Sequence, residues 1–231
     1  MNKAASLSLI IPAYNEEAGI DDAIKKNLIN LSASSVPFEI IVIDDGSKDN
    51  TKKIVEQNYS GNPLITFYSK PNGGFGSAVK KGIELAKNKY ILFVPVDSPL
   101  NEKTLSTFME HLGKADILVS HRISRKGYSF RMKLNSGIYH FLISKAFNLS
   151  LKDYNWIHLY DRAIFDKIVI EDEGIFMLAE VLIKAKKNNY SFFEFPIEME
   201  ERMDGVKTAA SFKAAIRTFK ALLRFYFKNR T

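Results

Sequence analysis

Short apolar runs alternate with longer amphipathic stretches through the first half of the chain. The apolar runs are rich in Val, Ile and Leu, so we expect buried parallel strands there. The expected strands cover residues 7–11, 38–43, 64–68, 90–94 and 116–120. The expected helices between them cover residues 18–31, 50–59, 77–88 and 102–112. This alternation predicts an α/β fold, with an open, mostly parallel, doubly wound sheet flanked by helices.

The pattern changes after residue 121. We expect helices at 130–148 and 174–187 and a strand at 191–197, whereas 159–170 has a mixed pattern. A last helix is expected at 209–228. Its apolar face would carry Phe212, Ile216, Phe219, Leu223 and Tyr226. Its basic face would carry Lys213, Arg217, Lys220, Arg224 and Lys228. We therefore divide the chain into a globular domain of residues 1–208 and a C-terminal basic amphipathic helix of residues 209–231.

Polar residues follow each of the first two strands. The first strand is expected to end at Pro12, because proline donates no backbone hydrogen bond, and Tyr14 comes just after it. The second strand ends in Asp44 and Asp45. Open α/β sheets bind ligands outside the carboxyl ends of such strands. Tyr14 and Asp45 could hold a nucleotide there, although a turn that only caps the next helix would use similar residues.

A glycine-rich loop, Asn72-Gly73-Gly74-Phe75-Gly76, precedes the third expected helix. Glycine lets the backbone approach a ligand closely, and helix N-termini attract anions. A tight turn would explain each single glycine equally well. The loop lacks the G-x-G-x-x-G spacing and does not follow the first strand, which argues against a dinucleotide-binding dehydrogenase.

Three segments in combination resemble a known family. IIPAYNEE at 10–17, VIDDGSKDNT at 42–51 and NGGFG at 72–76 are similar to family-two glycosyltransferases of the GT-A fold, a Rossmann-like fold of nucleotide-diphospho-sugar transferases. The greatest similarity is to the dolichol-phosphate mannose synthase group, and it extends from residue 7 to about residue 207. The resemblance implies inverting transfer of a sugar from a nucleotide-diphosphate sugar, GDP-mannose or a UDP-sugar, to a polyprenyl phosphate.

The resemblance also implies roles for individual residues. The donor-binding residues would be Pro12, Ala13, Tyr14, Glu16, Asp44, Asp45, Gly73, Gly74, Gly76 and Val96. The acceptor-phosphate-binding residues would be Arg122, Arg131, Ser136 and Lys207. The catalytic residues would be Asp97, Arg122 and Arg202. Arginine binds phosphate as a fork and lysine as a point charge, which suits these positions.

Pro95-Val96-Asp97 stands where the family carries an Asp-x-Asp metal motif. Here Pro95 replaces the first aspartate, so Asp97 would be the single protein carboxylate that holds Mg²⁺ or Mn²⁺. Magnesium is often bound by one or two carboxylates together with substrate phosphates. The replacement puts the metal affinity in question, and Asp97 could instead cap the end of its strand.

No carboxylate stands out as a general base. A phosphate acceptor is already ionised and needs none, so catalysis would rest on alignment and charge stabilisation. A saccharide acceptor would need a base, for which Asp153, Asp161 and His158 are candidates. A third possibility is a non-catalytic protein that binds nucleotide sugars and lost turnover together with the first metal aspartate.

Positive charge is concentrated in two segments. Residues 202–231 hold eight Lys or Arg against one acid, and residues 121–145 hold six against none. The formal net charge of the chain is +7. Such segments favour anionic partners, here a polyprenyl phosphate and a membrane surface or membrane-protein partner. We expect no nucleic acid as a partner, because no recognition module is present.

The sequence also gives an expectation for localisation. There is no cysteine, and hence no disulfide, which suits the cytoplasm. We expect neither a signal peptide nor a membrane span, since no apolar run reaches about 18 residues. We therefore expect a cytoplasmic protein that is peripheral at the cytoplasmic face of a membrane. The alternative for the last helix is that its apolar face packs on the protein's own core.

Overall fold

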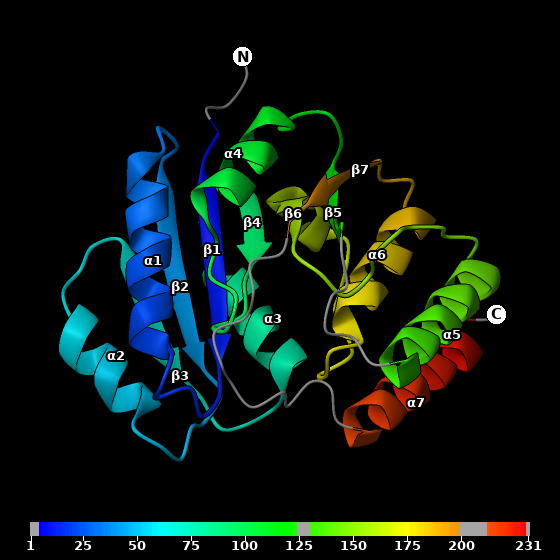
Figure 1. The fold of residues 1–231 in the computed structure, drawn as a ribbon, viewed down its shortest axis with the longest axis horizontal. Helices are drawn as coiled ribbons and strands as arrows, with labels where there is room; N and C mark the ends of the chain where they lie inside the picture. Colours follow the sequence, from blue (N-terminus) through cyan, green and yellow to red (C-terminus); the bar gives the residue numbers. More distant parts are fainter. Residues whose placement is uncertain (1–4, 124–129, 199–211, 230–231) are drawn as a thin grey trace.

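A computed structural model describes residues 5–123, 130–198 and 212–229 of the chain. Its centre is a seven-stranded sheet with the order β3-β2-β1-β4-β6-β5-β7 (Figure 1). The strands are β1 (Leu7–Ala13), β2 (Phe38–Asp44), β3 (Ile65–Ser69), β4 (Tyr90–Phe93), β5 (Ile117–Arg122), β6 (His158–Asp161) and β7 (Phe192–Ile197). Only β6 runs antiparallel to its neighbours. The open, mostly parallel sheet predicted from the sequence is confirmed.

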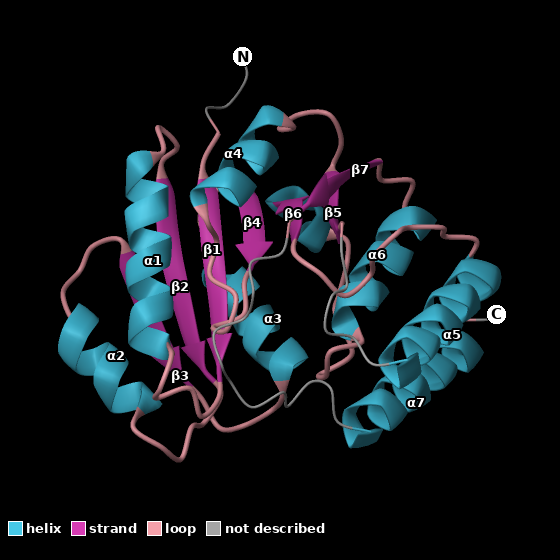
Figure 2. Cartoon of the chain, viewed as in Figure 1, coloured by secondary structure: helices cyan, strands magenta, loops and turns pink. Residues whose placement is uncertain are grey.

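Helices cover both faces of this sheet (Figure 2). They are α1 (Ile20–Ala33), α2 (Thr51–Tyr59), α3 (Phe75–Leu85), α4 (Glu102–Glu110), α5 (Phe130–Phe147), α6 (Met177–Lys187) and α7 (Phe212–Lys228). Helices α1, α2 and α4 share one core cluster with the sheet, and α3, α5, α6 and α7 share the other. Along β1 the side chains alternate between these clusters, since Leu9 and Ile11 belong to one and Ile10 to the other. This alternation is the two-residue period of a strand.

The prediction that β1 ends at Pro12 is wrong. The strand continues to Ala13, with Pro12 opposite Ile43 of β2. The Ile10 carbonyl accepts from Val94 on the β4 side, and the Ala13 carbonyl accepts from Asp45 on the β2 side. The alternation therefore turns the Pro12 nitrogen toward β4, which has ended at Phe93. Proline is tolerated because no ladder bond is needed from it there.

The mixed segment at 159–170 contains the strand that the pattern left undefined. β6 pairs antiparallel with both β4 and β5, and a short 3-10 helix, Arg162–Asp166, follows it. The strand has only four residues, which is too short a run for a periodic signal. The β6 strand therefore lies at the centre of the sheet although no sequence pattern predicts it.

Helix α7 packs on the protein, but only through part of the face expected from its sequence. From that face, Tyr226 contacts Phe147 of α5. Leu222 and Phe225 are buried in the core cluster shared with α5 and α6, and Phe219 packs against that cluster. Ile216 and Leu223, predicted for the same apolar face as Phe219, are exposed. The helix is apolar on more than one side, so a single-face description of it was incomplete. None of the described helices is long and apolar enough to cross a membrane.

Candidate active site

The loops that follow β1 and β2 are joined by hydrogen bonds at the carboxyl edge of the sheet. The Asn15 N–H donates to Ser47 Oγ at 2.9 Å, and the Asn15 side chain accepts from the Lys48 N–H at 2.8 Å. The Glu16 N–H donates to Thr51 Oγ1 at 2.8 Å. Asn15 has a φ of 55°, in the left-handed region that asparagine tolerates better than most residues. The two loops therefore form one rigid wall.

Tyr14 stands on this wall with 43% of its surface exposed. Ala13 is buried beneath it, and Pro12 is half-buried. An exposed ring on a fixed loop at a strand end can pack on a planar base. The residues predicted from the first motif thus lie together at the sheet edge.

The carboxylates of Asp44 and Asp45 are both buried, and both accept hydrogen bonds from protein groups. The Asp44 carboxylate accepts from the Ser47 N–H at 3.1 Å and from Ser69 Oγ at 2.7 Å. The Asp45 carboxylate forms an ion pair with Lys70 at 2.5 Å. It also accepts from the Gly73 and Gly74 N–H groups, at 3.0 and 2.7 Å. These bonds use three of roughly four lone-pair positions of Asp45, which leaves it one acceptor position for a ligand.

The glycine loop packs against the turn at 171–174. A Cβ at Gly74 would lie 2.5 Å from the Glu173 carbonyl oxygen, and one at Gly76 would lie 2.3 Å from the Asp172 carbonyl oxygen. Gly74 also has a φ of 94°, which strongly favours glycine. Close backbone packing therefore accounts for these two glycines whether or not a ligand approaches them.

Glu16 lies close enough to Asp97 for the two negative charges to repel each other. Burial raises the pKa of Glu16 above its ordinary value, and the negative charges of Asp97 and Asp49 raise it further. Asp97 is exposed, whereas the Val96 side chain is buried under the start of α1, 3.4 Å from where a Cβ at Gly19 would lie. A cation would relieve the repulsion between these carboxylates. The pair thus fits a divalent ion that takes most of its ligands from a diphosphate, and the described residues contain no group of three or more metal-ligating side chains.

Arg122, at the end of β5, lies at the same edge of the sheet and is already paired. Its Nε and NH2 groups donate to Asp153 at 2.7 and 3.0 Å, and only 9% of the Arg122 side chain is exposed. The guanidinium lies 4.6 Å from the ring centre of Trp156. A buried, bidentate and stacked arginine is held firmly, so it orients Trp156 and the loop after α5.

None of the three base candidates is placed for proton transfer. Asp153 is buried under Arg122. Asp161 pairs with Tyr90 at the opposite, amino-terminal edge of the parallel strands, where it caps the 3-10 helix. His158 is buried, and burial lowers its pKa to about 4 although Asp153 opposes the shift. The positions of Asp153 and Asp161 thus give no support to a saccharide acceptor, which would need one of them as its base.

Comparison with known proteins decides which family this site belongs to. A model of glycosyl transferase family 2 matches residues 8–174, from β1 to the turn before α6. The chain belongs to glycosyltransferase family 2. The enzyme class predicted from the three motifs is confirmed.

Individual relatives agree with this family-two assignment. Dolichyl-phosphate beta-glucosyltransferase of Dictyostelium discoideum is 31% identical over 250 residues, which cover 96% of this chain and 74% of that protein. Undecaprenyl-phosphate 4-deoxy-4-formamido-L-arabinose transferase of Proteus mirabilis is 28% identical over 174 residues, which cover 72% of this chain and 52% of that protein. This chain therefore spans about half the length of the second relative.

Solved structures confirm the GT-A fold of this glycosyltransferase. Glucosyl-3-phosphoglycerate synthase of Mycobacterium tuberculosis, in complex with Mn²⁺, uridine diphosphate and glucosyl-3-phosphoglycerate, superposes with a TM-score of 0.73. The match covers 96% of this chain and 80% of that chain, at 15% sequence identity. At that identity the likeness concerns the fold alone.

The remaining predicted residues of the glycosyltransferase are divided between two segments. Arg131 and Ser136 lie on α5, Arg131 exposed and Ser136 half-buried. Arg202 and Lys207 fall outside the described residues. The sequence analysis missed Lys70 and Trp156, which hold Asp45 and Arg122. Lys70 directly follows β3, at the same sheet edge as Asp45, so its position in the strand order was the available signal.

Proposed function

We propose that this family-two glycosyltransferase moves a hexosyl group from a nucleotide-diphosphate sugar to a polyprenyl phosphate. The proposal rests on the positions of the three candidate bases. Asp153 is paired with Arg122, Asp161 lies at the amino-terminal edge of the parallel strands, and His158 is buried. A hydroxyl acceptor would have to lose a proton to a base. A phosphate acceptor attacks in its ionised form, and two relatives are named as transferases for polyprenyl phosphates.

In the proposed reaction the acceptor phosphate oxygen attacks the anomeric carbon of the donor sugar. The bond from that carbon to the donor diphosphate breaks on the opposite side, so the nucleoside diphosphate leaves and the configuration inverts. Tyr14 and Asp45 hold the nucleoside against the wall formed by the two loops. Arg131 and Ser136 on α5 orient the acceptor phosphate. Alignment of the two substrates supplies most of the rate acceleration.

A divalent cation would be held at Asp97, with Glu16 beside it and the donor diphosphate supplying the other oxygens. Bound Mg²⁺ or Mn²⁺ supplies neutralisation of the charge that develops on the departing diphosphate. The solved relatives of this fold support the choice of ion, because they contain Mn²⁺ or Mg²⁺ together with uridine diphosphate. Pro95 leaves Asp97 without a second aspartate two residues before it.

Donor placement is tested by isothermal titration calorimetry with UDP and GDP in the presence of Mg²⁺. Asp45→Ala should weaken binding more than tenfold, which is about 1.4 kcal/mol. Asp161→Ala is the matched control, since that carboxylate lies at the opposite sheet edge and its removal should leave affinity unchanged. Equal affinities for wild type and Asp45→Ala would refute the placement. Release of nucleoside diphosphate upon addition of polyprenyl phosphate vesicles would separate an enzyme from a protein that only binds the donor.

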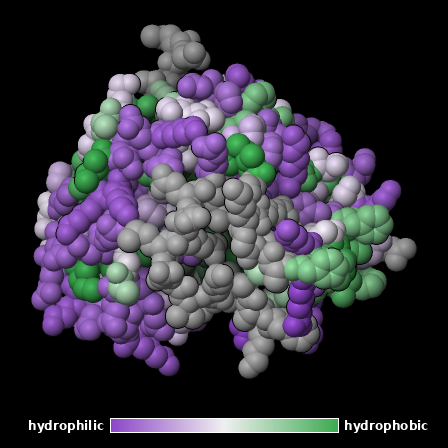
Figure 3. Space-filling view, viewed as in Figure 1, coloured by the Kyte–Doolittle hydropathy of each residue, from purple (hydrophilic) through white to green (hydrophobic). Residues whose placement is uncertain are grey.

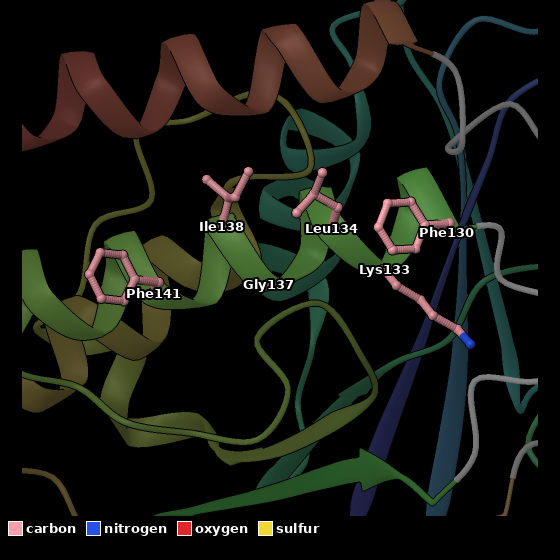
Figure 4. Close-up of a pocket in the computed structure, with 6 residues that line it drawn as sticks. All are labelled: Phe130, Lys133, Leu134, Gly137, Ile138 and Phe141. Atoms are coloured by element: carbon pink, nitrogen blue, oxygen red, sulfur yellow. The ribbon is translucent and has the colours of Figure 1, made fainter.

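We also propose that α5 and α7 meet the membrane that holds the lipid acceptor. Four apolar side chains, Phe130, Leu134, Ile138 and Phe141, lie exposed in a row along α5. Together with Lys133 and Gly137 they line a shallow depression (Figure 4). This α5 apolar row coincides with the hydrophobic area at the right of Figure 3. Ile216, Leu223 and Phe227 add exposed apolar surface on α7.

Exposed cations surround the α5 apolar row. Arg131, Lys133 and Lys145 are exposed on α5, and each cation near an anionic surface contributes about 1 kcal/mol. An apolar row bordered by cations is the composition of a helix that lies in the headgroup region. The membrane surface expected from the sequence combined the apolar face of the last helix with the basic segment at 121–145, and the α5 apolar row adds to it an apolar surface within that segment.

Co-sedimentation with vesicles that contain phosphatidylserine tests the membrane surface. Phe130→Ser with Phe141→Ser should release most of the bound protein at low salt. Ile29→Ser is the matched control, because Ile29 is equally exposed but lies on α1, on the other face of the sheet. Binding that is unchanged in the double variant would contradict the assignment of α5 to the membrane.

A further inference from the structure

Glu180 of α6 is fully buried and has an unusual set of partners. Its Oε1 accepts from the Glu171 N–H at 2.9 Å and from Lys184 Nζ at 2.6 Å. Its Oε2 accepts from the Asp172 N–H at 2.8 Å. A buried carboxylate is costly unless such bonds compensate it. Glu180 therefore fixes the backbone of the turn at 171–174 from the inside of the protein.

The glycine loop packs directly on the turn at 171–174. The Gly76 N–H donates to the Glu173 carbonyl oxygen at 2.8 Å, and the packing at Gly74 and Gly76 leaves no room for a Cβ. In Figure 1 the segment that leads into α6 reaches the first turn of α3. A shift of the turn would therefore push directly against the backbone of the glycine loop.

The glycine loop in turn holds Asp45. The Gly73 and Gly74 N–H groups donate to the two oxygens of that carboxylate, at 3.0 and 2.7 Å. The path from Glu180 to Asp45 thus consists of the turn at 171–174, a contact between two backbones, and the glycine loop. Each link in this path is either a hydrogen bond or a backbone contact too close to admit a methyl group. A displacement of the turn at 171–174 is therefore transmitted to the glycine loop with little loss.

We propose that Glu180 is a positioning residue for donor binding, acting through the turn at 171–174 and the glycine loop to hold Asp45 in place. The inference rests on the proposed function for the identity of the ligand. Glu180 itself touches no substrate, because its side chain is completely enclosed. Both of its oxygens are needed as acceptors, because the Glu171 N–H donates to one and the Asp172 N–H to the other. A neutral amide would place an NH2 donor opposite one of these N–H groups.

A weaker link joins the same turn to α7. Lys228 forms an ion pair with Glu171, but both side chains are substantially exposed, at 65% and 42%. Exposed pairs of this kind contribute little. Lys228→Met therefore serves as a control variant that disturbs the turn only from its outer side.

Glu180→Gln keeps the size of the side chain but has only one acceptor oxygen for the two N–H groups. Hydrogen exchange should become faster at residues 72–76 in this variant, with or without nucleotide. The Kd for UDP or GDP, whichever binds the wild type, should rise roughly 2- to 30-fold, the range found when coupled networks are perturbed. Lys228→Met should change neither quantity.

Two controls distinguish positioning from general loss of stability. Glu39→Gln changes a carboxylate that also accepts from a backbone N–H, that of Lys87 at 2.7 Å, but at the amino-terminal edge of the sheet. It should leave exchange at 72–76 and nucleotide affinity unchanged. Gly76→Ala disturbs the same contact from the α3 side, so its effect on affinity should not add to that of Glu180→Gln.

The outcomes separate this inference from the proposed function. Unchanged exchange at 72–76 in Glu180→Gln overturns the inference, whatever the ligand. Faster exchange with additive effects of Glu180→Gln and Gly76→Ala on affinity also overturns it. If exchange becomes faster at 72–76 while wild type binds neither UDP nor GDP, the link from Glu180 to the loop is supported and the proposed function fails.

Discussion

His158 should make the stability of the protein depend on pH between about 6.5 and 4. The side chain is 1% exposed, and neither ring nitrogen has a hydrogen-bond partner among the described residues. Burial lowers its pKa from 6.5 to about 4 in the folded protein. The unfolded chain therefore binds the proton more tightly than the folded chain, and stability falls as the pH drops through this window.

The magnitude follows from the two pKa values. Each pKa unit corresponds to about 1.4 kcal/mol, so the full difference is about 3 kcal/mol below pH 4. Between pH 7.5 and pH 5, linkage gives a loss of about 2 kcal/mol from this one group. That is a sizeable share of the 5–15 kcal/mol typical of a folded domain.

Urea denaturation of wild type and His158→Phe at pH 7.5 and pH 5 measures this effect. The phenyl ring cannot be protonated, so the stability of the variant relative to wild type should rise by about 2 kcal/mol on going to pH 5. Taking the difference cancels the contribution of all other groups, including His121, whose pKa is also lowered, mainly by burial. A difference in stability that stays constant between the two pH values would refute the reasoning.

Two further predictions concern the site. Arg122→Met should destabilise the fold by about 3 kcal/mol in urea denaturation, because it leaves the Asp153 carboxylate buried without its cation. The double variant Arg122→Met with Asp153→Leu should recover most of this stability. No recovery would mean that loss of the ion pair is not the cause of the destabilisation. Pro95→Asp should tighten Mn²⁺ binding about tenfold, because a second carboxylate joins Asp97. The affinity is measured with the donor nucleotide present, and an unchanged value would place the ion elsewhere.

The strand–helix alternation could be predicted because it follows from local chemistry. β-Branched runs such as 38–43 and amphipathic stretches such as 18–31 each specify an element on their own. The carboxyl-edge site could be predicted for the same reason, since Tyr14 and Asp45 directly follow strands. The end of β1 was misplaced because tertiary pairing decides it. Proline lacks an N–H, but at Pro12 this group would face the side where β4 has already ended, so nothing is lost.

The remainder of the site depends on contacts between distant segments. Arg122 and Asp153 are 31 residues apart and Gly74 and Glu173 are 99 apart, so no window along the sequence contains either pair. The buried face of α7 was only partly assigned because its apolar residues occupy several sides, and it is packing on the core cluster around α5 and α6 that selects Leu222 and Phe225. The role of Glu180 was missed because a Glu in a helix is usually solvated.

The insertion of β6 between β4 and β5 has a consequence for synthesis of the chain. β5 ends at residue 122 and β6 begins only at residue 158. The facing edges of β4 and β5 therefore leave the ribosome with their backbone groups unpaired, and at roughly 5–20 residues per second this lasts some seconds. Unpaired edges are templates for aggregation. Slow translation between these strands should therefore lower the yield of folded enzyme.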